Sequence, residues 1–156
     1  MKKYLQKKLN NEKGMTLIEL LAVIVIIAII AAIAIPAIGN IIENSRYSAV
    51  KSDATNVLAA ANIYFTENPE AANGTVTVGD LMTKGYLQSA GKFETIKTEA
   101  TVTKANPNTL DTAKAIEYSG AKTVTFDEAS TDDINGDSLK GSDDPDSKTI
   151  PAATGE

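Results

Sequence analysis

An unbroken apolar run near the N-terminus, followed by periodic apolar patterns, dominates this chain. From Leu20 to Ile42 there are 23 consecutive positions without a charged side chain, and about 18 or more apolar residues are enough for a helix to cross a bilayer. Pro36 removes one helical hydrogen bond, so we predict a kink there, with a helix end at Pro36 as the alternative. Over residues 40–67 the apolar positions recur at helical spacing and predict an amphipathic helix. The apolar stripe of this helix is Tyr47, Val50, Ala54, Val57, Leu58, Ala61, Tyr64 and Phe65.

The middle of the chain predicts a small domain built on that helix. A short helix is expected over residues 80–85, with Asp80 as its N-cap and Gly85 as its C-cap. Tyr86 and Leu87 are expected to pack on the long helix. After residue 91 the pattern changes to a period of two, with Thr, Val, Ile and aromatic side chains, as is typical of strands. The strands expected in an antiparallel meander are 94–103, 115–118 and 123–126.

The C-terminal part of the chain is acidic. Residues 128–156 hold eight acids, two lysines and few large apolar side chains. Such a segment cannot bury enough surface by itself to offset the entropy of ordering it. We therefore expect an exposed, partly mobile tail. The predicted fold is α+β, in which the hydrophobic half of a long helix protrudes and its amphipathic half packs on a small antiparallel sheet.

Within this acidic segment, one pattern resembles the start of a calcium-binding loop. Asp133, Asn135 and Asp137 alternate, and Asp144 stands at the twelfth position. Ser138 occupies the place where such a loop has its turn glycine, and no helices are expected on either side. A solvated acidic segment without a bound cofactor is therefore the favoured interpretation, and a Ca²⁺ site is the alternative.

Charge is divided unevenly along the chain. Residues 1–14 carry five lysines and one acid, whereas residues 15–156 carry ten basic and nineteen acidic side chains. Short basic flanks stay on the cytoplasmic side of a membrane, so we expect the N-terminus inside and an acidic domain outside. An acidic domain repels phosphates, and direct nucleic acid binding by a single subunit is not expected. The chain has no Cys and no His, so the usual nucleophile–base pairs are missing and an enzyme is not expected.

The junction between the basic leader and the apolar run carries the main functional signal. Gly14 ends the leader, Met15 begins the next segment, and Glu19 stands at the start of the apolar run, where a carboxylate is costly without a partner. This junction resembles the leader of type IV prepilins, with a small residue before the cut and an acid at the fifth position after it. Pro36 also falls where members of that family commonly have a proline. The resemblance is strong over residues 8–45 and holds only in general layout downstream.

The resemblance implies how the chain is processed. A membrane-embedded prepilin peptidase would cut between Gly14 and Met15 and methylate the new amino group of Met15. Many relatives have Phe at this position. The implied organisation is a leader (1–14), a transmembrane and filament-core helix (15–42), a globular pilin head (43–127) and the acidic tail (128–156).

The resemblance also implies partners and a location. The precursor would be a single-pass protein of the plasma membrane, and the pilus assembly machinery there would add it to a helical homopolymer on the cell surface. The alternative is a pilin-like subunit of a competence or type II secretion apparatus, which has the same N-terminal chemistry. A third interpretation is a membrane-anchored binding protein whose leader is not cleaved.

Cleavage would give Glu19 a partner. The methylated amine of Met15 in a neighbouring subunit is the natural partner of the Glu19 carboxylate, and leaving a buried charge unpaired is strongly unfavourable. The pair would therefore penalise subunits docked at the wrong axial height. Small side chains allow helices to approach closely, and the family often loses helix before the proline on assembly, so 32–36 is a candidate for local unwinding. The small residues are Ala28, Ala31, Ala32, Ala34 and Ala37.

Overall fold

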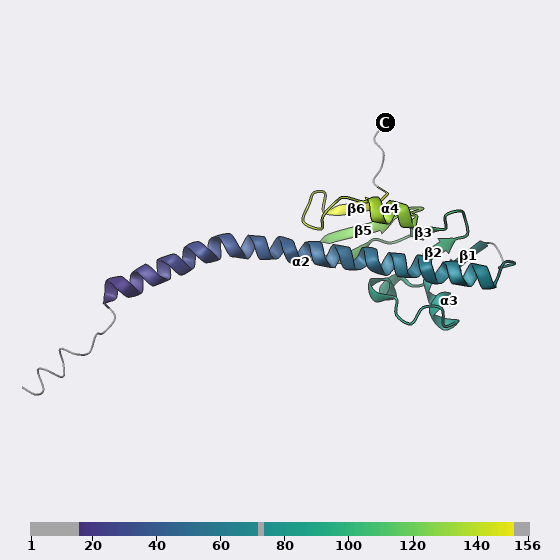
Figure 1. Ribbon diagram of the computed structural model, residues 1–156, viewed down its shortest axis with the longest axis horizontal. Helices are drawn as coiled ribbons and strands as arrows, with labels where there is room; N and C mark the ends of the chain where they lie inside the picture. Colours follow the sequence, from purple (N-terminus) through teal and green to yellow (C-terminus); the bar gives the residue numbers. More distant parts are fainter. Residues whose placement is uncertain (1–15, 72–73, 152–156) are drawn as a thin grey trace, which may run out of the picture. The chain divides into compact units, whose positions relative to one another are not determined.

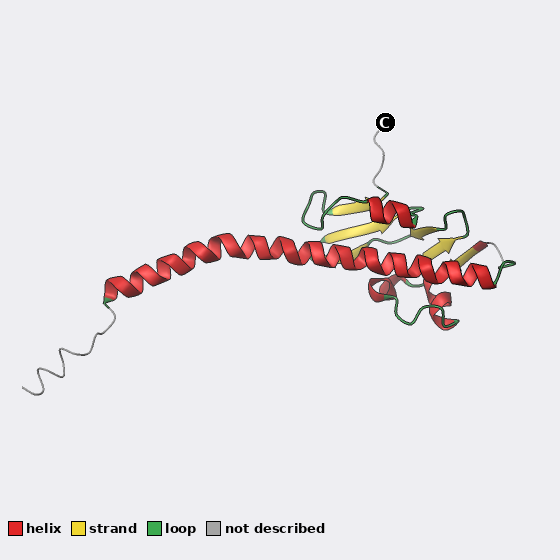
Figure 2. Ribbon diagram, in the orientation of Figure 1, coloured by secondary structure: helices red, strands yellow, loops and turns green. Residues whose placement is uncertain are grey.

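The computed structural model describes residues 16–71 and 74–151, and Figures 1 and 2 show their helices and strands. The chain divides after Gly39 into two units, and helix α2, Leu17–Glu67, contributes to both. We call the second unit, from Asn40 onward, the head. Its elements after α2 are β1 (Thr75–Thr77), α3 (Val78–Thr83), the 3-10 helix η2 (Gly91–Ile96), β2 (Ala100–Thr103), β3 (Thr109–Thr112), β4 (Ile116–Ser119), β5 (Lys122–Phe126), α4 (Thr131–Gly136) and β6 (Ser147–Ile150).

Helix α2 confirms the long helix predicted from the sequence. It runs through Pro36 without interruption, so the alternative of a helix end at that residue is wrong, and the kink stays a prediction. In the head, all eight apolar positions of the predicted stripe are buried, and Ala60 joins them. This buried stripe is the surface on which the rest of the head packs.

The strands of the head form two three-stranded sheets (Figure 2). In the first sheet, β2 pairs antiparallel with both β1 and β3. In the second, β5 pairs antiparallel with β4 and parallel with β6. The α+β class with small antiparallel sheets is confirmed, but the expected meander is divided between two sheets, and β1, β3 and β6 were not predicted.

One predicted strand is partly a helix. Residues 94–96 belong to η2, and only the end of the predicted strand 94–103 is extended, as β2. Phe93 and Ile96 are both buried, and residues three apart lie on the same face of a 3-10 helix. Burial of these two side chains on one face therefore overrides the alternating pattern.

The two sheets are joined through a buried threonine on β3. The Thr112 hydroxyl accepts a hydrogen bond from the Phe126 backbone N–H (2.9 Å) and faces the Phe126 carbonyl oxygen at 3.3 Å. Leu110 and Ala129 also exchange backbone hydrogen bonds of 2.9 Å. The end of β5 is thus attached to β3, and the sheets share one core in which the Phe93 and Phe126 rings lie 5.7 Å apart.

The short helix α3 begins earlier than predicted. Its N-cap is Thr77, whose hydroxyl accepts a hydrogen bond from the Asp80 N–H at 3.0 Å. Asp80 is therefore the third helical residue, and its carboxylate lies 2.8 Å from the Thr77 hydroxyl. The C-cap is Lys84, and Gly85 follows it with a φ of +83°, where glycine is favoured. The prediction of the caps was wrong by three residues at the N-terminus and by one at the C-terminus.

The segment after α3 packs on α2, as predicted. Leu87 is buried, and the Tyr86 ring lies edge-on to the Tyr64 ring with 5.4 Å between centroids. The Tyr86 hydroxyl donates a hydrogen bond of 2.6 Å to Glu67. Together these contacts hold the segment after α3 against the C-terminal end of α2.

The acidic C-terminal segment is part of the folded head. The expectation of an exposed tail from residue 128 is wrong for residues 128–151, because Ile134, Lys148 and Ile150 are buried there. The segment gains its order from contacts distant in sequence: β6 pairs with β5 along its length. Ala129, Ile134 and Ile150 are buried in the shared core, and Leu139 packs against it.

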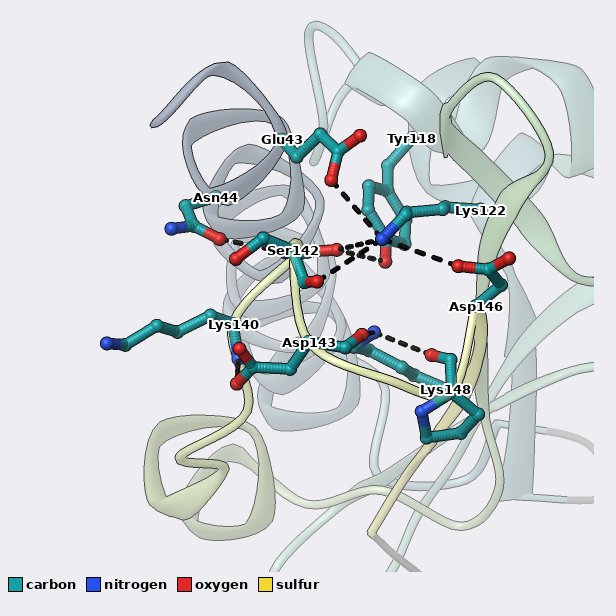
Figure 3. A network of polar contacts seen from close by, with 11 residues as sticks. Glu43, Asn44, Tyr118, Lys122, Lys140, Ser142, Asp143, Asp146 and Lys148 are labelled. Carbon is teal, nitrogen blue, oxygen red and sulfur yellow. Dashed lines mark hydrogen bonds and ion pairs between the residues drawn. The ribbon is translucent and has the colours of Figure 1, made fainter. Parts of the chain in front are cut away.

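Polar contacts also attach the C-terminal segment to α2, near the point where the head begins (Figure 3). The Lys122 ammonium lies 3.2 Å from a Glu43 carboxylate oxygen and 3.3 Å from that of Asp146. These two carboxylates raise the pKa of Lys122 although burial acts to lower it. The Ser142 N–H donates to the Asn44 side chain at 2.9 Å. The loop between α4 and β6, residues 137–146, therefore contacts α2 directly through the Ser142 backbone and indirectly through Lys122, which Glu43 and Asp146 share.

Two further features bring the loop close to α2. A Cβ added to Gly141 would lie 2.3 Å from the Glu43 carbonyl oxygen, so a larger residue would force the loop away. The buried Lys148 ammonium donates a hydrogen bond to the carbonyl oxygen of Asp143 (Figure 3). It donates another to the carbonyl oxygen of Pro145. It also faces the Tyr118 ring at 5.9 Å. Lys148 thus satisfies backbone oxygens that the turn would otherwise leave unpaired.

Candidate assembly site

Glu19 caps the N-terminus of its own helix. Its Oε2 accepts hydrogen bonds from the Thr16 backbone N–H (2.7 Å) and the Thr16 hydroxyl (2.9 Å). In return, the Glu19 N–H donates to the Thr16 hydroxyl at 3.3 Å. This reciprocal arrangement is a capping box, which satisfies backbone donors that a helix start leaves free. Its Thr-x-x-Glu spacing is a sequence signal that could have revealed it.

The capping box changes how the acid at the start of the apolar run is understood. A carboxylate at a helix N-terminus is also favoured by the helix dipole. Both hydrogen bonds go to Oε2, and within the described residues no hydrogen bond reaches Oε1. A carboxylate offers about four acceptor positions, so Glu19 can hold its helix start and accept a cation at the same time.

Most of the apolar half of α2 is exposed, and only Ala31 and Ala34 are half-buried before Ile42. Sixteen large apolar side chains between Leu17 and Ile42 are exposed, from 45% to 83%. By length and composition, one helix in the part of the chain that the structure describes could cross a membrane, and it contains this segment. Soluble monomers rarely expose contiguous apolar patches larger than a few hundred Å². This surface therefore requires lipid or other apolar helices around it.

The small residues and Pro36 lie within this accessible surface. Pro36 is exposed inside the continuous helix. A Cβ placed on Gly39 would meet nothing within 4 Å, so its small size serves no packing contact inside the described chain. Residues 32–36 are helical here, and their unwinding on assembly stays a prediction.

The processing residues Gly14 and Met15 lie outside the described residues. The first described residue, Thr16, is already a member of the capping box. The structure therefore begins one residue after Met15, and the roles of both processing residues stay predictions.

The calcium alternative finds no support in the structure. Asp133 lies in α4, where its carboxylate accepts hydrogen bonds from the Ser130 N–H (2.9 Å) and hydroxyl (2.5 Å). The hydrogen bond from the Ser130 hydroxyl lowers the pKa of Asp133. Asn135 is also in this helix, and Asp144 is exposed. No group of three or more His, Cys, Asp or Glu in residues 16–71 and 74–151 could hold a metal ion.

Asp137, the remaining residue of that pattern, is used inside the head. Its carboxylate accepts a hydrogen bond of 2.7 Å from the Tyr47 hydroxyl and lies 3.2 Å from the Lys51 ammonium. Burial, and then the hydrogen bond to Asp137, hold the pKa of Tyr47 well above its ordinary value. The acid therefore links the C-terminal segment to α2.

Comparison with known proteins gives one match. Residues 9–35 match the family model of the prokaryotic N-terminal methylation motif. The matched segment includes the Gly14–Met15 junction, Glu19 and most of the apolar run. No curated protein and no solved structure matches the chain.

Proposed function

We propose that this type IV pilin-like prepilin is the structural subunit of an extracellular type IV pilus, cleaved after Gly14, methylated at Met15 and assembled through the apolar half of α2. The observation that carries this proposal is the match to the methylation motif at residues 9–35, together with the sixteen exposed large apolar side chains of α2. Such a surface is compatible with lipid before assembly and with identical helices after it.

The motif implies processing by a prepilin peptidase and assembly into a pilus-like polymer. The five lysines of residues 1–14 support a precursor with its N-terminus in the cytoplasm and its head outside. From there, assembly machinery in the plasma membrane would transfer the subunit to a growing homopolymer on the cell surface. The role is structural and involves no catalysis by the subunit.

Glu19 has a defined part in this proposal. Its Oε2 is held by Thr16, and its Oε1 is open within the described chain. The Met15 amine of a neighbouring subunit would bind this open side, at the one axial height that brings the two groups together. Because an unpaired charge is strongly disfavoured inside an apolar bundle, the pair would select the correct docking position.

The alternative is a pilin-like subunit of a competence or type II secretion apparatus. Both kinds of protein share the N-terminal chemistry, so the amount of the chain in long surface filaments separates them. A binding protein with an uncleaved anchor agrees less well with a methylation motif that spans the cleavage junction.

The deciding measurement is the intact mass of the chain in filaments sheared from the cell surface. We expect a chain that begins at methylated Met15 and is abundant in the sheared fraction. A chain that still carries Met1 would reject the proposal. A processed chain that stays with the cell envelope and forms no surface filament would favour the secretion or competence role instead.

A further inference from the structure

The head has an uncharged surface on the exposed side of α2. Residues 54–66 contain no charged side chain, and the loop at 105–108 beside them contains none either. A hollow of about 410 Å³ lies between the helix and this loop, and none of its lining residues is charged. We call this surface the uncharged face. Its main exposed members are Ala59, Asn62, Ile63 and Pro107, and the half-buried Thr55 and Asn108 line the hollow beside them.

An exposed isoleucine stands beside the hollow. Among the described residues after Ile42, Ile63 is the one large apolar side chain that is exposed, at 54%. It lies four residues after Ala59, so the two side chains are neighbours on the helix surface. Asn62, which lines the hollow, has an exposed amide with no hydrogen bond to the described residues. The face thus offers apolar surface and neutral hydrogen-bonding groups side by side.

Other hollows on the described part of the head have a different character. One is lined by Arg46, Lys92 and Glu117, and another by Asp80 and Lys97. The chain after its leader has nineteen acids against ten basic residues. Identical acidic heads repel one another, and closing a contact over an unpaired charge is costly. Two such heads therefore make contact with the smallest free-energy penalty through a surface without charge.

We propose that the uncharged face is a docking surface for the head of a second copy of this chain. The proposal rests on the proposed function, in which copies already associate through the apolar half of the same helix α2. A contact between two different surfaces of identical subunits extends into a filament wherever its rotation does not close into a ring. The uncharged face would supply one of those surfaces.

The test inserts one negative charge into the face without changing shape. Asn62→Asp converts an exposed amide into a carboxylate on the face, and Gln88→Glu makes the same change at an exposed position outside it. We expect Asn62→Asp to reduce shear-resistant filament at least about tenfold, equivalent to about 1.4 kcal/mol. Gln88→Glu should leave the yield unchanged. Thermal denaturation of both heads should match that of the wild type.

A second measurement identifies the occupant of the face. A photoreactive phenylalanine analogue at position 63 should form cross-links within filaments to head peptides of another copy, and the same analogue at position 88 should not. Normal filament yield in Asn62→Asp, or cross-links from position 63 only to other molecules, would overturn the inference while leaving the proposed function intact. Absence of any wild-type filament containing the processed chain would instead defeat the proposed function.

Discussion

Two substitutions at the start of α2 separate helix capping from subunit pairing. Glu19→Gln keeps an oxygen that can accept the hydrogen bonds of Thr16, because Gln is accepted at this position of a capping box, but it removes the negative charge. Thr16→Ala does the reverse, since it removes the N-cap hydroxyl and keeps the carboxylate. The structure shows that both residues belong to one capping box, so either change alone tests one role.

The expected losses of filament yield in the two variants differ by more than tenfold. Loss of an N-cap hydroxyl costs about 1 kcal/mol of helix stability, so Thr16→Ala should lower filament yield by about fivefold at most. Glu19→Gln would leave the methylated amine of the neighbouring subunit without its anion inside an apolar bundle. That loss should reduce subunit addition by about a hundredfold or more.

The assay is the amount of processed chain in sheared surface filaments, relative to processed chain in the membrane. Processing itself should be unchanged in both variants, which the intact mass verifies. Normal filament yield in Glu19→Gln would refute the pairing role and leave Glu19 as a helix cap. Equal losses in both variants would show that the helix start, and not the charge, limits assembly.

Three further outcomes follow from the same structure. Gly14→Leu should block cleavage and leave the full-length chain in the membrane fraction, and a processed product of normal mass would contradict the assigned junction. Tyr47→Phe removes the donor to Asp137 and should lower the free energy of unfolding by about 1–3 kcal/mol, measured as a lower denaturation midpoint at neutral pH. Because Ser130 lowers the pKa of Asp133 below its ordinary value of 3.8, the stability that this acid contributes is present above that value. It is lost as the pH falls through the folded-state pKa. Thermal scans should therefore show an acid-side loss of stability, and Asp133→Asn should reduce its pH dependence.

The helical part of the fold could be predicted because its signal is local. Tyr47, Val50 and the rest of the stripe recur with the helical period, and this period alone assigns the buried face. The capping box at Thr16 and Glu19 was equally local, since its spacing is visible in the sequence. The charge of Glu19 in an apolar segment points first to a partner in another subunit, whereas its nearest partner in the structure is Thr16.

The second sheet could not be predicted in the same way. Strand β6 pairs with β5 although residues 127–146 separate the two strands. The sequence around β6 shows only acids, turn residues and small side chains. The sequence predicts a solvent-exposed side chain for Lys148. It is only 1% exposed, because its ammonium donates hydrogen bonds to the carbonyl oxygens of Asp143 and Pro145. Such placements depend on contacts that form only once the fold exists.

The acids of the C-terminal segment explain how this segment is held against α2 without a disulfide. Asp137 pairs with Lys51 of α2, and Asp146 shares Lys122 with Glu43 of α2. The partners of the first pair are 86 positions apart in sequence, a separation that a disulfide would otherwise bridge. The side chains of Lys51 and Asp137 are only 18% and 6% exposed, so removing one of them would leave the other charge shielded from water without a partner, which is strongly destabilising. The composition that predicted a solvated tail therefore supplies charges that hold this segment to α2 when they meet lysines of the head.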